Sequence, residues 1–311
     1  MITVEHLTKC YGDFLAVDDL SFEIEEGHVY GFLGPNGAGK STTMNIITGC
    51  LSATSGRVRI DGHDIFEEPG AAKRLIGYLP EQPPLHLNET PVAYLRFVGE
   101  ANGLRGGALE RQIAEVVEQT RLTGVRHRCI SALSKGYRQR VGIAQALLGS
   151  PRVIILDEPT VGLDPLQIIE IRELIRQLGQ THTVLFSSHI LSEVQAVCER
   201  VIVINRGSIV ADGTPDSLAH SLSNENRLLL RMEGEEKAIK QGLHSRRGVK
   251  EVDAYGEKEP GVYEFSVEGN EGTDLRRPVF ALAAQNHWPI LSMKNTDLTL
   301  EDVFLRLTSD L

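Results

Sequence analysis

One segment limits the possible fold of this chain more than any other: residues 34–42 read Gly-Pro-Asn-Gly-Ala-Gly-Lys-Ser-Thr. They match the pattern G-x-x-x-x-G-K-[ST] of a phosphate-binding loop, the Walker A motif. The apolar run Val29–Leu33 directly before them predicts a buried strand, and a helix is expected to open near Lys40. Strand, loop and helix in this order are the setting that the motif requires. The chain is therefore expected to have an α/β fold of the P-loop type.

The chemistry of such a loop comes mainly from its backbone. Its glycines allow the chain to wrap around a polyphosphate with the N–H groups turned inward. The helix after the loop adds free N–H groups and the positive end of its dipole. Lys40 is expected to reach the β- and γ-phosphates, and the Ser41 hydroxyl to hold Mg²⁺. The sequence therefore predicts a nucleoside triphosphate site. Its residues are Gly34, Pro35, Asn36, Gly37, Ala38, Gly39, Lys40, Ser41 and Thr42.

Length and charge limit the organisation of the chain and its partners. The 311 residues suffice for two domains, one large and one small. There are 32 basic and 42 acidic residues, so the formal charge is −10 and the isoelectric point is about 5.5. Nucleic acid binding depends on clustered Lys and Arg, so this balance argues against nucleic acid as the main partner.

Cysteine usage and hydropathy favour a cytoplasmic location. Cys10, Cys50, Cys129 and Cys198 are far apart and show no C-x-x-C spacing, which fits a reducing compartment. No secretion signal is expected, because Met1 runs directly into a strand-like segment. The longest apolar stretches have the length of strands, well short of the ~20 residues of a membrane helix. If the protein serves a membrane process, another chain is expected to supply the membrane part.

The first two thirds of the chain predict a layered α/β domain. Strands are expected at Ala16–Ile24 and Val29–Leu33, with a short hairpin piece at Gly56–Gly62, and helical periodicity covers residues 90–148. The apolar helical positions are Leu109, Ile113, Val116, Val117, Val141, Ile143, Ala144 and Leu147. The elements expected next are strand Val153–Leu156, helix Ile168–Leu178, strand Thr183–Phe186, helix Leu191–Cys198 and strand Val201–Ile204. Apolar strands that alternate with helices predict a mostly parallel sheet covered on both faces.

The character of the sequence changes near Asn224, where a second domain is expected to begin at residue 225. Its expected elements are strand Arg227–Met232, helix Glu235–Leu243, strands Val249–Tyr255 and Val262–Val267, helix Asp274–His287 and strand Ile290–Lys294. A turn at residues 256–261 separates the middle strands, and a final helix is expected at Leu300–Leu307. The order β-α-β-β-α-β predicts a small α+β domain of the ferredoxin-like type.

Two adjacent carboxylates follow the apolar strand at 153–156. Asp157 lies where ligands collect in a parallel sheet and is expected to hold Mg²⁺ through water. Glu158 is then placed to polarise the attacking water of a hydrolysis reaction. No Asn-Lys-x-Asp motif that reads guanine occurs in the sequence. The pair therefore favours an ATPase over a GTPase.

The segment at 133–140 reads Leu-Ser-Lys-Gly-Tyr-Arg-Gln-Arg and opens an apolar helix before that strand. Ser134 fits an N-cap, and a serine hydroxyl with free N–H groups forms another receptor for a γ-phosphate. Over residues 1 to about 220 the chain resembles the nucleotide-binding subunits of ABC transporters. The motifs that carry this resemblance, in the family's order, are Tyr11, 34–42, Gln82, 133–140, 153–158 and His189. Together with residues 298–304, Leu-Thr-Leu-Glu-Asp-Val-Phe, the 134–140 segment is similar to gliding-motility-associated and multidrug-type ATPases that serve ABC-2 permeases.

The resemblance implies a role for each matching residue. Tyr11 would stack on adenine, Gln82 would contact Mg²⁺ or the attacking water, and His189 would contact the γ-phosphate. Ser134 and Gly136 would contact the nucleotide held by an opposite protomer, with Asp164 at the dimer seam. The predicted catalytic residues are Glu158, His189 and Gln82, and the predicted metal residues are Ser41, Gln82 and Asp157.

The resemblance also implies an architecture and partners. An ABC ATP-binding domain at 1–220 would combine a mostly parallel sheet, an antiparallel β subdomain and an α-helical subdomain at about 83–150. ATP and Mg²⁺ would be bound by a homodimer, or by a pseudo-dimer with a related ATPase, at the inner face of the cell membrane. A permease on a separate chain would dock on helical residues 90–120, with Tyr94 and Phe97, and ATP hydrolysis would power export.

This chain departs from the family pattern in its signature segment. The usual sequence has Gly where this chain has Lys135, and Gln where it has Tyr137. Ser134 and Gly136 remain, so phosphate recognition is expected to survive. Arg138 and Arg140 fit either a functional surface or a solvated helix face.

Two other functions fit the sequence less well than a transport ATPase. A soluble ABC ATPase of the repair, chromosome-structuring or translation type would need a long coiled coil or two cassettes. Only about 50 residues separate Gln82 from Ser134, without sustained heptads. A ligand-sensing role for the second domain would rest on His244, His287 and Arg246–Arg247, which are more typical of ordinary surface.

Overall fold

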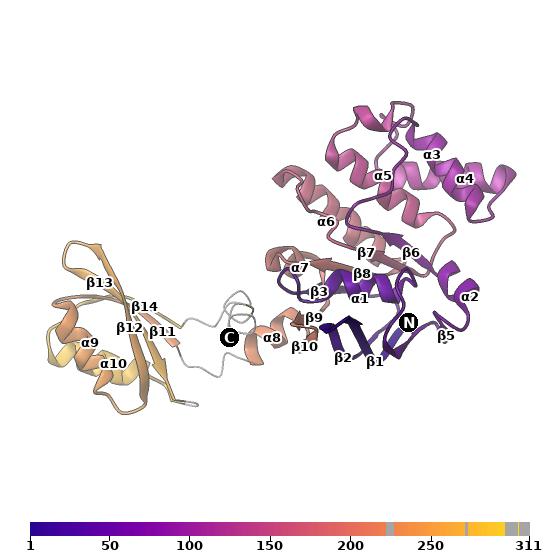
Figure 1. The fold of residues 1–311 in the computed structure, drawn as a ribbon. Coiled ribbons are helices and arrows are strands. Elements are labelled where there is room, and N and C mark those ends of the chain that lie inside the picture. Colours follow the sequence, from indigo (N-terminus) through magenta and orange to yellow (C-terminus); the bar gives the residue numbers. More distant parts are fainter. Residues whose placement is uncertain (222–226, 271–272, 296–303, 305–311) are drawn as a thin grey trace. The chain divides into compact units, whose positions relative to one another are not determined.

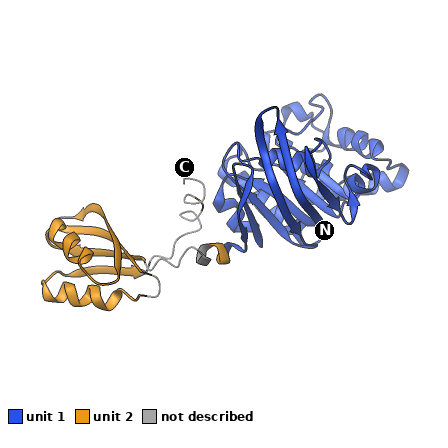
Figure 2. Ribbon diagram, turned by 60° about the horizontal axis from the view of Figure 1, so that its bottom comes forward, with its two compact units in different colours: residues 1–215 blue, residues 216–311 orange. Residues whose placement is uncertain are grey.

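The computed structural model describes residues 1–221, 227–270, 273–295 and 304 of the 311-residue chain. Contacts within the chain divide it into two compact units, Met1–Pro215 and Asp216–Leu311 (Figure 2). Each unit has a hydrophobic cluster of its own. Helix α8 (Pro215–Ser221) begins at the boundary between them.

A six-stranded sheet forms the centre of the first unit (Figure 1). Its strands lie in the order β10-β9-β3-β8-β7-β6, and all neighbours are parallel except β10 and β9. The strands are β3 (Val29–Leu33), β6 (Ile76–Leu79), β7 (Val153–Leu156), β8 (Thr183–Ser188), β9 (Arg200–Asn205) and β10 (Ser208–Gly213). Strands β3 and β7 are buried along their whole length, which explains why their sequences are continuous apolar runs. The predicted mostly parallel sheet is confirmed.

The strand order positions the candidate site. Because β3, β8 and β7 are adjacent and parallel, their carboxyl ends meet at one edge of the sheet. The loops that follow these strands carry the glycine-rich segment, His189 and the Asp157–Glu158 pair. Ligands of open α/β sheets bind at this edge. Three motifs far apart in the sequence are thus placed together.

Seven helices are described in the first unit up to residue 197. They are α1 (Lys40–Ile47), α2 (Pro69–Arg74), α3 (Pro91–Ala101), α4 (Gly106–Gln119), α5 (Lys135–Leu147), α6 (Pro165–Gly179) and α7 (Leu191–Val197). Helices α3, α4 and α5 contact one another and form a helical lobe (Figure 1). All eight apolar positions predicted to face inward on α4 and α5 are buried. The helical periodicity of this region therefore gave its packing correctly.

A second, antiparallel sheet lies beside the first and shares its core. Its order is β2-β1-β4-β5, built from β1 (Ile2–Tyr11), β2 (Phe14–Ile24), β4 (Ser55–Ile60) and β5 (His63–Asp64). Buried residues of this sheet, of α1 and of the parallel sheet belong to one hydrophobic cluster, including Phe22, Met44 and Phe32. The antiparallel sheet therefore braces the helix that follows the glycine-rich loop.

The second unit has the predicted order β-α-β-β-α-β. The elements are β11 (Arg227–Glu233), α9 (Glu236–His244), β12 (Val249–Glu259), β13 (Val262–Gly269), α10 (Arg276–Gln285) and β14 (Ile290–Asn295). The strands form an antiparallel sheet in the order β12-β13-β11-β14, and both helices contribute to its core. Interleaving of this kind is the ferredoxin-like arrangement.

The structure differs from the sequence predictions mainly at element ends. Strand β2 begins at Phe14 rather than Ala16, because Phe14 pairs with Tyr11 across a turn at Gly12. Strand β12 continues to Glu259 through the residues predicted as a turn, because an edge strand tolerates charged, exposed side chains. Strand β6 and helices α2 and α8 were not predicted. The helix expected at Leu300–Leu307 lies outside the described residues, apart from Phe304, which is helical.

Candidate functional site

The glycine-rich loop after β3 owes its path to two glycines that no other residue could replace. At Gly34 a Cβ atom would lie 2.4 Å from the carbonyl oxygen of Ile204. At Gly39, where φ is +105°, a Cβ atom would lie 2.6 Å from the carbonyl oxygen of Ala16. Both positions pack the loop against neighbouring backbone, so a side chain there would push the loop out of place. The glycines of the motif therefore set the loop geometry, as the sequence predicted.

Lys40 begins α1, and its ammonium group lies inside the loop. Its Nζ donates to the carbonyl oxygens of Gly34 at 2.9 Å and Pro35 at 3.3 Å. It also forms an ion pair with Oε1 of Glu158 at 3.2 Å, and both side chains are almost fully buried. All three partners are oxygens, as the phosphates of a nucleotide would be. The cation is thus held within the loop, and it directly links the loop to the residues that follow β7.

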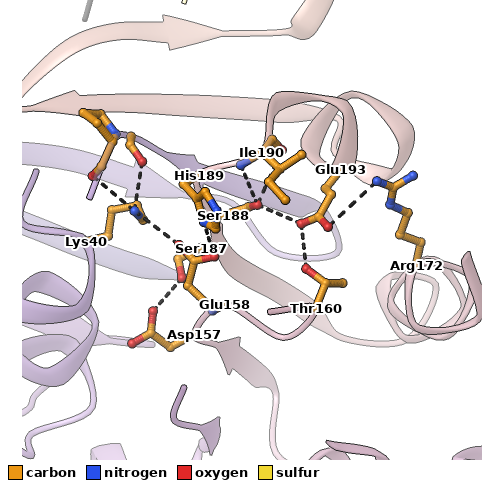
Figure 3. A network of polar contacts seen from close by, with 12 residues as sticks. Lys40, Asp157, Glu158, Thr160, Arg172, Ser187, Ser188, His189, Ile190 and Glu193 are labelled. Atoms are coloured by element: carbon orange, nitrogen blue, oxygen red, sulfur yellow. Dashed lines mark hydrogen bonds and ion pairs between the residues drawn. The ribbon is translucent and has the colours of Figure 1, made fainter. Parts of the chain in front are cut away.

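Asp157 and Ser187 form a buried hydrogen-bonded pair at the end of β7 and β8. Ser187 Oγ donates to Asp157 Oδ1 at 2.6 Å and accepts from the Glu158 N–H at 2.9 Å (Figure 3). Burial raises the pKa of the Asp157 carboxyl, while hydrogen bonds from Ser187 and Ser41 oppose that rise. Ser41 and Asp157, the two residues predicted to act together on Mg²⁺, are therefore neighbours.

Glu158 is held from two sides by charged or polar partners. Its Oε2 accepts from Nδ1 of His189 at 2.9 Å, and its Oε1 pairs with Lys40 (Figure 3). The backbone of Glu158 has φ +47°, a left-handed conformation that costs a non-glycine residue of order 1–3 kcal/mol. Conformations of this kind persist where the surroundings enforce them, and they cluster at functional sites. The structure thus brings together Lys40, Asp157, Glu158 and His189 at one sheet edge.

A cavity of about 470 Å³ lies over this cluster. Its lining is Tyr11, Phe14, Ala16, Asn36, Gly37, Gly39, Lys40, Ser41, Thr42, Glu81, Glu158, Val161 and His189. The Tyr11 side chain is half exposed, with Lys9 Nζ 5.2 Å from its ring centroid. Sequence reasoning missed Phe14, which is 64% exposed and gives this cavity a second aromatic wall. The signal that could have found it is the two-residue turn between Tyr11 and Phe14, which pairs the two residues across the hairpin.

Gln82 is not among the residues that line this cavity. It lines a neighbouring cavity of about 450 Å³ together with Glu81, Lys135, Arg138 and other side chains. Glu81 and Val161 line both cavities, so the two are adjacent. The structure therefore places Gln82 beside the cluster of Lys40 and Glu158 and does not bring it into contact with that cluster.

Ser134, Gly136 and Asp164 also lie outside the cavity over Lys40. Ser134 caps α5 by accepting from the Tyr137 N–H at 3.4 Å, and Asp164 caps α6 by accepting from the Gln167 N–H at 2.9 Å. A Cβ atom at Gly136 would lie 2.6 Å from the Gln167 side chain, so the starts of the two helices are in contact. These three residues form a group of their own, with Ser134 and Asp164 exposed at the surface.

Comparisons with known proteins identify the family. A family model described as ABC transporter matches residues 17–161. The linearmycin resistance ATP-binding protein LnrL of Bacillus subtilis (strain 168) is 33% identical over 309 residues, which cover 99% of this chain and 98% of that protein. The chain belongs to the ABC transporter ATP-binding proteins.

Further relatives agree with this assignment. The bacitracin transport ATP-binding protein BcrA of Bacillus licheniformis is 36% identical over 243 residues, covering 75% of this chain and 78% of that protein. A solved dimeric ATP-binding cassette in a post-hydrolysis state, with ADP and Pi bound, is 27% identical with a TM-score of 0.62. That match covers 69% of this chain and 98% of the cassette. The chain is accordingly an ATP-binding, ATP-hydrolysing subunit of an ABC transporter, and the alternative of a soluble non-transport ABC ATPase is not favoured.

One sequence expectation for this ABC subunit needs correction, and one choice that the sequence left open is now decided. Tyr94 was expected at a docking surface, but it is 2% exposed and its hydroxyl bonds Gln145 and the Pro84 carbonyl, so it belongs to the core. Arg140 is 5% exposed and binds Glu170 Oε2 at 2.6 Å, so it does not lie on a solvated face. The apolar residues of this region are buried as predicted. The burial of Tyr94 and Arg140 depends on hydrogen-bond partners that are distant in sequence, so the sequence did not indicate it.

The oxygen donors of the site fit a magnesium ion. Mg²⁺ prefers oxygen ligands and is usually held in nucleotide sites by one or two carboxylates, substrate phosphates and water. The Ser41 hydroxyl and the Asp157 carboxylate supply such donors. Among the described residues, no group of three or more His, Cys, Asp or Glu side chains is arranged for a metal ion. A resident metal cluster is thus not indicated there, whereas a magnesium ion brought with a nucleotide is chemically suitable.

Within the described parts of the chain, none of the helices is both long enough and apolar enough to cross a membrane.

Proposed function

We propose that two copies of this chain, or this chain and a related ATPase, close head to tail on two ATP molecules and drive a separate membrane permease. One observation carries this proposal: Ser134 is exposed at the start of α5, next to the buried Gly136, and both lie outside the cavity that contains Lys40 and Glu158. A second protomer that presents its own Ser134 would complete the phosphate site. The dimeric cassette among the similar structures supports this arrangement.

The surface next to Asp164 supports the same dimer. Leu166 and Ile169 lie on α6 one helical turn apart, and they are 75% and 60% exposed. Large apolar side chains so exposed and adjacent on a helix indicate a contact surface rather than ordinary solvent exposure. Asp164, Leu166 and Ile169 would form part of the seam between the protomers.

In the proposed reaction, ATP enters the cavity with its base beside Tyr11 and Phe14. Its phosphates replace the carbonyl oxygens and Glu158 as partners of the Lys40 ammonium group. Glu158, released from Lys40, then accepts a proton from the attacking water, while His189 holds the γ-phosphate side of the site. Ser41 and Asp157 would hold a Mg²⁺ ion, which would supply positive charge at the phosphate oxygens, and Gln82 in the neighbouring cavity would contact that ion or the water.

The partners and location follow from this role. Phe97 on α3 is 55% exposed, and its ring centroid lies 4.9 Å from that of His86, so it would offer an aromatic contact to a permease helix. The protein would then lie at the inner face of the membrane, bound through the permease. Two of the relatives are named for linearmycin resistance and bacitracin transport, which favours export as the direction.

The chain organisation proposed here is an ABC ATP-binding domain at 1–220, with its helical subdomain at about 83–150, and an accessory domain at 225–311. The nucleotide motifs all precede residue 190. On the accessory sheet, Arg227 pairs with Glu268 and Arg231 with Glu264, so its charges neutralise one another. A protein surface is therefore a better partner for it than an anionic ligand.

A mixing experiment tests the head-to-tail dimer. Lys40→Ala disables the loop, and Ser134→Arg places a bulky charge where the second nucleotide would sit, so each variant alone should be inactive. In a mixed dimer, one site contains both defects and the other is intact, so the mixture should recover ATPase activity, up to about a quarter of wild type. ATPase rates of each variant and of mixtures at several ratios provide the measurement.

The control mixture combines Lys40→Ala with Lys40→Ala/Ser134→Arg, in which no intact site can form. Restored activity in the first mixture and none in the control would support the shared site. If the two single variants, shown by circular dichroism to be folded, never complement each other at any ratio, the site is formed within one chain.

Asp157→Asn is expected to stabilise the nucleotide-free protein while it removes Mg²⁺-dependent hydrolysis. The pKa of Asp157 is raised by burial, so ionising it costs more in the folded than in the unfolded chain. This cost to the free energy of folding is absent at a pH well below the ordinary carboxyl pKa, where Asp157 is protonated in both states. It is complete at a pH above the raised pKa, where Asp157 is ionised in both states. The Tm at pH 7 should therefore rise, because the neutral amide does not pay the cost of burying a charge.

Thermal melts of wild type and Asp157→Asn at pH 7 and pH 4 measure this effect, with Asp216→Asn as a control outside the site. The difference between variant and wild type should shrink at the lower pH. An equal or larger difference at pH 4 would show that charge burial is not its cause.

A further inference from the structure

A buried carboxylate behind the catalytic cluster has no role in the site described so far. Glu193 lies in the first turn of α7 and is 1% exposed. Its Oε2 accepts two hydrogen bonds, from Thr160 Oγ1 at 2.7 Å and from Ser188 Oγ at 2.8 Å (Figure 3). It does not line the cavity over Lys40, so it does not face a bound nucleotide.

The two hydroxyl donors lie beside the proposed catalytic pair: Thr160 is in the loop that carries Glu158, and Ser188 is the last residue of β8. Thr160 lies two residues after Glu158, and Ser188 directly precedes His189. Ser188 Oγ also accepts from the Ile190 N–H at 3.0 Å, so the backbone on both sides of His189 is tied to this hydroxyl. One oxygen of Glu193 therefore connects the loop of Glu158 to the end of β8, directly before His189.

The other oxygen of Glu193 lies toward helix α6. Arg172 Nη2 is 3.9 Å from Glu193 Oε1, which is an ion pair without a hydrogen bond. Glu193 Oε1 and Arg172 Nε are buried atoms that have no hydrogen-bond partner in the described part of the chain. Burying such groups is costly, and native structures keep few of them. A charge held here at that cost indicates a functional requirement beyond packing.

We propose that Glu193 is a positioning residue for ATP hydrolysis, which sets the separation of Glu158 and His189 by holding Thr160 and Ser188 with a single oxygen. The inference rests on the proposed roles of Glu158 and His189. The two side chains are 2.9 Å apart at their closest polar atoms, and each sits on a loop without regular structure. Because misplacement by about 1 Å can cost a hundredfold in rate, a clamp between these loops would act on turnover rather than on ATP binding.

A purely structural role makes a different prediction. An acidic residue in the first turn of a helix interacts favourably with the helix dipole, and its loss lowers stability. In that case the folded fraction of a variant would hydrolyse ATP at the normal rate. Turnover per folded molecule therefore separates the two roles.

The test compares Glu193→Ala with Glu193→Gln. Alanine removes the acceptor, so kcat should fall by about tenfold or more while KM for ATP stays within about threefold. Glutamine keeps an oxygen in the same place for Thr160 and Ser188, so kcat should return to within about threefold of wild type. Glu199→Ala, an exposed carboxylate just beyond α7, is the matched control and should leave both constants unchanged.

Thr160→Val and Ser188→Ala provide the second test and remain informative if Glu193→Ala does not fold. Each removes one donor and should lower kcat, and in the double variant Thr160→Val/Ser188→Ala the two effects should overlap rather than add, because both act through one clamp. The proposal is overturned if Glu193→Ala changes kcat no more than Glu199→Ala, or if neither Thr160→Val nor Ser188→Ala lowers kcat. Normal turnover in Glu158→Gln would instead overturn the assigned base, which is a separate result.

Discussion

Glu158→Gln is expected to lower ATP turnover by roughly a hundredfold or more while ATP affinity stays the same or increases. The amide cannot accept the proton of the attacking water, so the chemical step loses its base. ATP binding should not weaken, because Glu158 forms an ion pair with the Lys40 ammonium group at 3.2 Å. A neutral amide would not form this ion pair, so the cation would be free to bind the phosphates. Loss of hydrolysis without loss of affinity is the combination that a general base predicts.

The same variant should accumulate as an ATP-bound dimer, because closure on ATP would no longer be reversed by hydrolysis. Single-turnover ATPase assays, a fluorescent ATP analogue and size exclusion with and without ATP-Mg²⁺ measure the three effects. Glu67→Gln, which changes an exposed carboxylate outside the site, is the control. Retained turnover would place the base elsewhere, and a monomer at saturating ATP would count against a dimer formed without the permease.

The motifs that could be read from the sequence are those that act through local backbone. Residues 34–42 match a complete loop motif, and Gly34 and Gly39 stand where the structure leaves no room for a Cβ atom. The Asp157–Glu158 pair was placed correctly because a buried apolar run fixes where strand β7 ends. In both cases the sequence signal lies within about ten residues of the feature that it predicts, although the backbone that crowds Gly34 and Gly39 is that of Ile204 and Ala16.

The parts of the site that the sequence did not give depend on partners far along the chain. Ser187 bonds Asp157 across 30 positions, and Thr160 bonds Glu193 across 33. Serine, threonine and glutamate at these positions look like ordinary strand-end and helix-start residues. Only the adjacency of β7 and β8 brings them together, and that pairing is a property of the assembled sheet.

Burial of single side chains was predicted well for apolar residues and poorly for amphipathic ones. The spacing of Leu109, Ile113 and Val116 identified the inner face of α4. A tyrosine such as Tyr94 can lie on the buried or on the exposed face of a helix. Here it is buried, and its hydroxyl donates a hydrogen bond to Gln145. The partner is on α5, so the periodicity of α3 alone could not settle the choice.

Lys40→Ala should lower the affinity for ATP-Mg²⁺ by roughly a hundredfold or more, equivalent to about 2.8 kcal/mol of binding free energy. The Lys40 ammonium group lies inside the glycine-rich loop, where charge-assisted hydrogen bonds to phosphate are stronger than those of backbone N–H groups alone. Alanine removes that charge and leaves Glu158 as a buried carboxylate without its cation. The remaining negative charge would repel the phosphates, so the loss should exceed that of a hydrogen bond alone.

Isothermal titration with ATP-Mg²⁺ measures this affinity, and a thermal melt confirms that the variant is folded. Lys73→Ala is the matched control, since Lys73 also donates to a backbone carbonyl, that of Gly49 at 2.9 Å, but is exposed outside the cavity. The double variant Lys40→Ala/Glu158→Gln separates the two causes. Without the carboxylate, the repulsion disappears and part of the affinity should return, whereas the contribution of the missing ammonium group stays lost. Wild-type affinity in Lys40→Ala would exclude Lys40 as a phosphate ligand.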